Sequence, residues 1–355
     1  MANSILIVGA GPTGLTAAVE LTRLGHDVTI IDKRAGRAQL SRAVGILPAS
    51  IRILEPSGVA SRIQREAVRF SAIAFYHEAT ELARIPFGTE ADGSDTILGL
   101  PQDRTEAHLS DALKELGVAV SYGTAIEAVQ QDGAGVTAHF GGTQSRFDYL
   151  LGADGVRSTV RQYLNLPYEG FDIPGKWSIA DVDAPDWPEP TVFRGFLIPD
   201  GNVVIVAPMA PTRFRVVSST EDALAALPLP MRVEKLHRSG AFTISVRQTP
   251  AYGDGRVFLA GDAAHCHSPA GGRGMNLGIA DAADFAARLT AGTLEGFSDA
   301  RHQIGKKTIA FSEEMRSNIM SDSPLRRTLV ETGLRVVGNL PPVAHKFAQR
   351  FAGEL

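Results

Sequence analysis

The feature that most constrains this fold is the glycine motif GAGPTG near the N-terminus. It follows the apolar segment SILIV, which predicts a buried strand, and it opens a segment of helical character. The segment HDVTIID then predicts a second buried strand that ends at Asp32. A strand–helix–strand unit of this kind pairs its strands in parallel. Gly9 permits the tight turn, Gly11 lets the backbone approach a pyrophosphate, and Gly14 lets the helix pack on the strand.

This unit predicts a dinucleotide-binding site. The free N–H groups and the positive dipole end at the start of the helix favour phosphate groups. Asp32 stands where a carboxylate can accept a hydrogen bond from a ribose hydroxyl. A glycine-rich turn in an unrelated α/β protein is the alternative. The motif by itself leaves both NAD and FAD open as the ligand.

Two later segments also combine a strand, a turn and a helix. LLGADGVRSTVR places Asp154 after a strand and before a short helix near Ser158. Taken alone, this segment could also be an ordinary strand–turn–helix with an N-cap and no role in ligand binding. In VFLAGDAAHCHSPAGGRGMNLGIADA, Asp262 ends a strand and the glycine-rich loop 270–274 leads into a helix. Asp262 can accept from a polyol hydroxyl. The loop and the helix dipole could hold the N1/C2=O edge of a flavin, which becomes anionic on reduction.

The order of the segments predicts an α/β fold with an α+β second domain. Buried segments of the parallel type at both ends of the chain enclose alternating, antiparallel-type segments in the middle. We therefore expect a discontinuous, Rossmann-like cofactor-binding domain, an antiparallel-sheet substrate-binding domain and C-terminal helices. The expected ranges are 1–70, 99–166 and 256–322 for the first, 71–98 and 167–255 for the second, and 323–355 for the helices.

Composition excludes several classes of protein. The net charge of −4 gives no reason to expect nucleic acid or an anionic membrane surface as a partner. No apolar run approaches the roughly 18 residues of a membrane span, and no signal peptide is visible. The single cysteine, Cys266, rules out an internal disulfide and fits the cytoplasm. His265, Cys266 and His267 are too closely spaced to be three metal ligands from one loop, so we expect no metal.

The three glycine segments, in this order, resemble the class A flavoprotein monooxygenases, the family of p-hydroxybenzoate hydroxylase. The resemblance covers nearly the whole chain. GAGPTG is similar to the first fingerprint of that family, ADGVRSTVR to its DG fingerprint, and GDAAH with GGRGMNLGIADA to its GD fingerprint. LPQDRTEAHL resembles the branch of aromatic polyketide and phenol hydroxylases. The resemblance implies FAD as the cofactor, held by the Rossmann-like domain.

The resemblance also implies a set of FAD contacts. Arg42 matches a family arginine that reaches the FAD, Gln102 matches a flavin contact, and the backbone at Ile126 matches an adenine contact. The complete implied set is Gly9, Gly11, Pro12, Thr13, Gly14, Asp32, Lys33, Arg34, Arg42, Gln102, Ile126, Asp154, Gly261, Asp262, Pro269, Gly271, Gly272, Arg273, Gly274, Met275 and Asn276.

Candidate substrate contacts lie on the expected antiparallel sheet. Phe193, Phe196, Met209 and Phe214 are candidates for an apolar pocket above the flavin, with an ordinary core position as the alternative for each. Arg215, with its neighbour Arg213, could bind an anionic substrate group, and solvent exposure is the alternative. No Ser-His-Asp triad or carboxylate pair is needed, because the cofactor carries the difficult chemistry, and the sequence does not identify a substrate base.

Two features depart from the family pattern. Arg273 stands where relatives often carry glutamine or a small apolar residue. It could favour the anionic reduced flavin or contact a substrate anion, and a side chain that points to solvent is the alternative. The extra C-terminal domain of many polyketide hydroxylases is expected to be absent, because only residues 277–355 follow Asn276.

The resemblance implies an NAD(P)H-dependent FAD monooxygenase that hydroxylates an aromatic or polyketide-like small molecule through a flavin C4a-hydroperoxide. Such an enzyme would belong to secondary metabolism and act with O₂ as a monomer or homodimer. With one GxGxxG motif, NADH or NADPH should visit the flavin transiently. Another flavin reductase or dehydrogenase and a non-catalytic FAD-binding protein are the alternatives. A halogenase is disfavoured, because Trp177 and Trp187 do not form the WxWxIP pattern.

Overall fold

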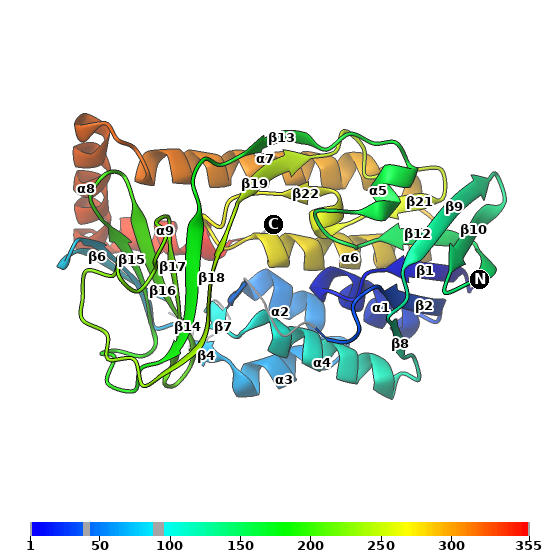
Figure 1. The fold of residues 1–355 in the computed structure, drawn as a ribbon, viewed down its shortest axis with the longest axis horizontal. Coiled ribbons are helices and arrows are strands. Elements are labelled where there is room, and N and C mark those ends of the chain that lie inside the picture. Colours follow the sequence, from blue (N-terminus) through cyan, green and yellow to red (C-terminus); the bar gives the residue numbers. More distant parts are fainter. Residues whose placement is uncertain (1, 38–42, 88–95, 354–355) are drawn as a thin grey trace.

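The structure is a computed structural model that describes residues 2–37, 43–87 and 96–353. Two large sheets lie at opposite ends of the molecule in Figure 1, and the long helices α6 (Gly274–Ala291) and α7 (Phe297–Ile319) run between them. The N-terminus lies at the end that holds the first sheet.

The first sheet has six strands, and its core confirms the predicted parallel unit. Its order is β20-β21-β12-β1-β2-β8, with every pair parallel except β20 and β21. Its strands are β1 (Ser4–Val8), β2 (Asp27–Asp32), β8 (Val120–Tyr122), β12 (Tyr149–Gly152), β20 (Gly253–Asp254) and β21 (Val257–Leu259). Ile5, Leu6 and Ile7 are consecutive and fully buried, as expected for a parallel strand covered on both faces.

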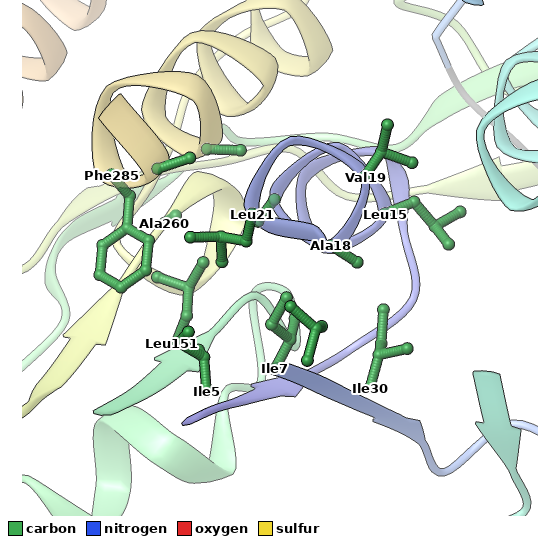
Figure 2. Close-up of a cluster of buried hydrophobic side chains, with 14 of the residues drawn as sticks. Ile5, Ile7, Leu15, Ala18, Val19, Leu21, Ile30, Leu151, Ala260 and Phe285 are labelled. Atoms are coloured by element: carbon green, nitrogen blue, oxygen red, sulfur yellow. The ribbon is translucent and has the colours of Figure 1, made fainter. Parts of the chain in front are cut away.

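Helices cover one face of this sheet. Leu21 of α1 (Pro12–Arg23) and Phe285 of α6 lie over Ile5 and Leu151 of the strands (Figure 2). The three-stranded sheet of β9 (Ile126–Asp132), β10 (Gly135–Phe140) and β11 (Thr143–Phe147) contributes buried residues to the same core. This packing places the start of α1 at the carboxyl ends of the parallel strands.

The second sheet has seven strands in the order β18-β14-β17-β16-β15-β5-β6. Its strands are β5 (Ala72–His77), β6 (Thr80–Pro86), β14 (Trp177–Asp183), β15 (Val192–Leu197), β16 (Val203–Ala210), β17 (Arg213–Ser218) and β18 (Lys235–Phe242). Neighbours are antiparallel, as predicted, except for β5 and β15, which pair in parallel. A parallel pair needs a long crossover, and the chain passes through the first sheet between these two strands.

Two small sheets connect the parts of the molecule. One contains β3 (Gly45–Ile46), β7 (Leu98–Gly99) and β4 (Val68–Arg69), and the other contains β13 (Glu169–Asp172), β19 (Ser245–Gln248) and β22 (His265–Cys266). The second of these small sheets pairs β13 and β19, from the expected substrate-binding domain, with β22, from the expected cofactor-binding domain. The division into domains therefore stays a prediction.

The remaining helices surround the sheets. They are α2 (Pro48–Leu54), α3 (Val59–Glu66), α4 (Gln102–Glu115), α5 (Thr159–Tyr163), α8 (Pro324–Asn339), α9 (Pro341–Ala352) and the 3₁₀ turns η1 (Gly261–Ala263) and η2 (Leu294–Gly296). Proline begins α8 and α9, where its fixed φ suits the first helical position. Both helices pack against β6 beside the second sheet (Figure 1). Within the described ranges, no helix has the length and apolarity that a membrane crossing requires.

Candidate functional site

A continuous cavity of about 1350 Å³ joins the two large sheets. Gly9, Gly11 and Asp32 line its end at the first sheet, and Phe75 and Phe193 line its end at the second. Most of the predicted cofactor residues line it, namely Gly9, Gly11, Pro12, Thr13, Asp32, Lys33, Arg34, Gln102, Ile126, Asp154, Asp262, Pro269, Gly271, Gly272, Arg273, Gly274 and Met275. Arg42 lies outside the described residues.

The glycine turn forms an open cradle at the start of α1. Gly11 is the N-cap residue and has no side-chain cap, and a Cβ added there would meet no atom within 4 Å. A Cβ on Gly14 would instead lie 1.8 Å from the carbonyl oxygen of Gly9, and one on Gly9 would lie 2.4 Å from that of Ala153. Gly9 has a φ of +107°. Gly14 is thus needed for packing, whereas Gly11 leaves space for a pyrophosphate.

Asp32 is an ionised acceptor at the end of β2. Its Oδ2 accepts from the Ala10 amide at 2.7 Å, and its Oδ1 accepts from the Arg34 amide at 2.8 Å. The Arg34 guanidinium donates to both oxygens, at 3.1 and 2.9 Å. Burial acts to raise the pKa of Asp32, but the hydrogen bonds from Arg34 and Ala10 outweigh it, and the pKa is lowered. This carboxylate suits a ribose hydroxyl.

Glu106 is a buried acid at the end of the cavity near Asp32, and it was not among the residues expected from the sequence. It is 1% exposed, and its Oε1 accepts from the side-chain nitrogen of Gln102 at 2.9 Å. Its Oε2 lies 3.6 Å from the Arg34 guanidinium. Glu106 therefore positions two of the predicted FAD contacts. The signal was an acid one helical turn after Gln102 in the PQDRTE segment.

The second segment contains the capped helix that the sequence allows, and Asp154 also lines the cavity. Asp154 lines the cavity, and its Oδ2 accepts from the Thr159 amide at 2.7 Å at the start of α5. Its Oδ1 accepts from the Ser158 hydroxyl at 2.5 Å, while Ser158 caps α5. Arg161 of α5 donates to the Ala263 carbonyl at 2.8 Å. The DG and GD segments are thus joined directly.

A buried charge network supports the Gly261–Asp262 turn. Asp281 of α6 is fully buried, and its Oδ2 accepts from the Gly261 amide at 2.9 Å. The same oxygen lies 2.6 Å from His265 Nε2, and Oδ1 accepts from Arg301 Nε at 2.7 Å. Burial acts to raise the pKa of Asp281, but His265 and Arg301 outweigh it, and the pKa is lowered. The sequence signal was an acid at helical spacing between Leu277 and Phe285.

Three predicted cofactor residues, Gly14, Gly261 and Asn276, do not line the cavity. Asn276 is fully buried, and its Oδ1 accepts from the Leu47 amide at 2.9 Å and the Ser50 hydroxyl at 2.8 Å. Its Nδ2 donates to the carbonyls of Gly45 and Gly272, both at 3.0 Å. Because its side chain is fully engaged by protein, Asn276 positions the glycine loop instead of reaching the cavity.

The predicted substrate residues divide between the cavity and the core. Phe193 and Phe196 line the cavity, whereas Met209 and Phe214 do not. Met209 is 1% exposed and Phe214 is fully buried in hydrophobic clusters, with the Phe214 ring 6.4 Å from that of Trp187. Successive strand residues face opposite sides of a sheet, which explains why Phe214 enters the core and its neighbour lines the cavity.

That neighbour, Arg215, is 2% exposed, so the solvent-exposed alternative is wrong for it. Its guanidinium donates to both oxygens of Asp181 at 2.7 Å, and it also donates to the Ala43 carbonyl at 3.2 Å. A bidentate pair of this kind neutralises the cation. Arg215 thereby connects the second sheet to the segment that precedes α2.

His267 adds a neutral imidazole to the cavity wall. Its Nδ1 lies 2.8 Å from the Ser268 carbonyl and 3.2 Å from the Ser312 hydroxyl, while its Nε2 is buried with no hydrogen-bond partner among the described residues. Burial, with the nearby charges of His265 and Arg273, lowers the pKa of His267 to about 4. The described residues contain no group of three or more His, Cys, Asp or Glu arranged to bind a metal.

We expect His267 to make the protein acid-sensitive. An unfolded chain binds a proton on this residue below about pH 6.5, whereas the folded chain does so only near pH 4. Stability should therefore fall as the pH drops from 6.5 to 4, by about 3 kcal/mol from this group. Urea unfolding of the wild type and His267→Gln across this window measures the difference. Parallel pH profiles for the two proteins would contradict the assignment.

The family model described as "FAD binding domain" matches residues 2–223 and 218–312. The chain therefore belongs to this FAD-binding family. The predicted α/β fold and the predicted cofactor, FAD, are confirmed.

Several curated relatives are monooxygenases. The uncharacterized aromatic compound monooxygenase YhjG of Bacillus subtilis is 30% identical over 88% of this chain and 68% of its own length. Pentachlorophenol 4-monooxygenase of Sphingobium chlorophenolicum is 32% identical over 79% of this chain and 56% of its own. The chain thus spans about half to two thirds of the length of these relatives. The predicted resemblance to aromatic-compound monooxygenases is confirmed.

A solved structure of a hydroxylase has the same fold. The anhydrotetracycline hydroxylase OxyS from Streptomyces rimosus is 28% identical and superposes with a TM-score of 0.81, covering 99% of this chain and 76% of that one.

Proposed function

We propose that this protein is an NAD(P)H- and O₂-dependent FAD monooxygenase that hydroxylates an aromatic or polyketide-like small molecule. The observation that carries the proposal is the continuous cavity that connects the cradle at α1 to an aromatic-lined space at the second sheet. When bound, FAD supplies electron transfer from the nicotinamide to O₂ and delivery of oxygen to the substrate. The protein must bind FAD and the substrate, orient them, and keep water out of the cavity.

The residues divide this work along the cavity. The amides at the start of α1 would hold the pyrophosphate, and Asp32 would accept from the ribose. Asp262 and the Pro269–Gly274 loop would hold the polyol chain and the ring edge, where the start of α6 favours negative charge. Phe193 would orient the substrate ring, whereas Phe196 is 1% exposed and packs in the same hydrophobic cluster as Phe214. The other predicted FAD contacts stay proposals of the same kind.

The test begins with the purified protein, which should be yellow and release FAD, not FMN. Oxidation of NADH or NADPH should accelerate when phenols or naphthols are added in air, and the product should gain one oxygen atom by mass spectrometry. Nicotinamide oxidation without an oxygenated product would instead indicate a reductase. Bound FAD with no turnover on any tested aromatic compound would indicate a carrier. A cytoplasmic location and a monomeric or homodimeric state stay predictions.

Gly11→Ala tests the cradle. The added methyl group would enter open space, so the apoprotein should fold normally. It would occupy the place proposed for the pyrophosphate, and FAD affinity should fall about tenfold or more, the scale of a packing conflict. Titration of apoprotein with FAD measures the loss. Gly14→Ala is the contrasting variant, because its methyl would strike the Gly9 carbonyl and destabilise the fold itself. Unchanged affinity in Gly11→Ala would place the pyrophosphate elsewhere.

A further inference from the structure

Arg273 is directed toward the C-terminal helix α9. Its Nη2 donates to the Arg350 carbonyl at 2.7 Å, and its guanidinium carbon lies 4.5 Å from the centre of the Phe311 ring. The residue is 7% exposed, so the alternative that it points to solvent is wrong. The Arg350 carbonyl belongs to the last turn of α9, where the helix dipole is negative and a cation is favourable.

Helix α9 carries part of the cavity wall. Phe347 and Phe351 stack on each other at 6.2 Å, and both line the cavity. Phe347 meets Phe75 of β5 edge-on at 6.1 Å, and Phe351 lies 6.4 Å from Phe87. These four rings form an aromatic wall at the substrate end, and two of them belong to α9. The shape of this end therefore depends on where α9 is held.

Apolar packing also holds α9. Ala344 and Ala348 are buried, and Phe347 and Phe351 pack against the same hydrophobic cluster. The bond from Arg273 is charge-assisted, and such bonds are among the stronger ones in proteins. The Arg350 guanidinium also lies over the Phe311 ring of α7, 5.3 Å from the ring centre. Arg273 and Phe311 thus connect the end of α9 to the glycine loop that precedes α6, while the like charge of Arg350 opposes that of Arg273.

We propose that Arg273 is a positioning residue that holds α9 against the substrate end of the cavity, so that Phe347 and Phe351 determine which ring systems fit. The role in substrate selection rests on the proposed function, whereas the docking of α9 does not. This accounts for an arginine at a position where the resemblance favours glutamine or a small residue. It couples the proposed cofactor loop to the substrate wall through one side chain.

Hydrogen–deuterium exchange on the FAD-loaded protein tests the docking without any substrate. In Arg273→Gln, which removes the charge and shortens the side chain, amides of residues 343–352 should exchange about tenfold faster. Exchange in α1 should not change. Arg273→Lys keeps a charged donor and should restore part of the protection. The matched control is Arg335→Gln on α8, an exposed arginine whose replacement should leave α9 as in the wild type.

Steady-state kinetics then test whether the docking of α9 affects which substrates the cavity accepts. In Arg273→Gln, KM for a turned-over aromatic substrate should rise severalfold with a smaller change in kcat, and the preference between small and large ring systems should weaken. Equal α9 exchange in wild type and Arg273→Gln would overturn the docking proposal, even if the flavin spectrum changed. Faster α9 exchange with unchanged substrate preference would overturn the role in selection. An inactive wild type would refute the proposed function yet leave the exchange result standing.

Discussion

Replacement of Asp281 by alanine should lower the free energy of unfolding by about 3–5 kcal/mol. The carboxylate is fully buried and faces Arg301 and His265. Its removal leaves the Arg301 guanidinium, which is 5% exposed, without its carboxylate in a site with little solvent, and it also leaves the Gly261 amide without its acceptor. An uncompensated buried charge is among the most destabilising changes a single substitution can produce.

Urea unfolding of the apoprotein measures this effect, since bound FAD would add its own contribution. The matched control is Asp284→Ala on the same helix, an acid paired with Arg288 at 2.8 Å but partly exposed. That change should cost at most about 1 kcal/mol. If the two variants lose similar stability, the buried network around Asp281 does not support the Gly261–Asp262 turn as we describe.

Replacement of Asp32 by alanine should weaken FAD binding by about 1–3 kcal/mol, the scale of a lost charge-assisted hydrogen bond. Asp32 is 6% exposed, lines the cavity and is ionised at neutral pH. Its loss also releases Arg34, whose guanidinium it orients.

Fluorescence titration of apoprotein with FAD gives the two affinities. Asp27→Ala, at the exposed start of the same strand, is the control and should bind FAD like the wild type. Because the pKa of Asp32 is lowered, the wild-type affinity should be constant across neutral pH and fall only in strong acid. An Asp32→Ala protein that binds FAD as tightly as the wild type would remove this residue from the ribose site.

The amino-acid sequence by itself determined the features that depend on neighbours along the chain. GAGPTG needs small residues within one turn, because Gly9 adopts a positive φ and Gly14 touches the Gly9 carbonyl. The buried run from Ile5 to Val8 and the acid that ends β2 are equally local. Such features define the α/β class, the position of the cofactor cradle and the family, and the structure and the comparisons confirm the fold and the family.

Only the tertiary structure decided the contacts between residues far apart in the chain. Arg215 finds Asp181 on the adjacent strand β14, and Asp281 joins Gly261 to Arg301, pairings that no local pattern encodes. Strand alternation allowed either Phe214 or Arg215 to face the cavity, and the packing of Phe214 near Trp187 settled it. Arg273 reaches a carbonyl 77 residues later, because the fold brings α9 back over the glycine loop. Each charged side chain has many possible partners in the chain, and the burial of the apolar faces determines which partner it meets.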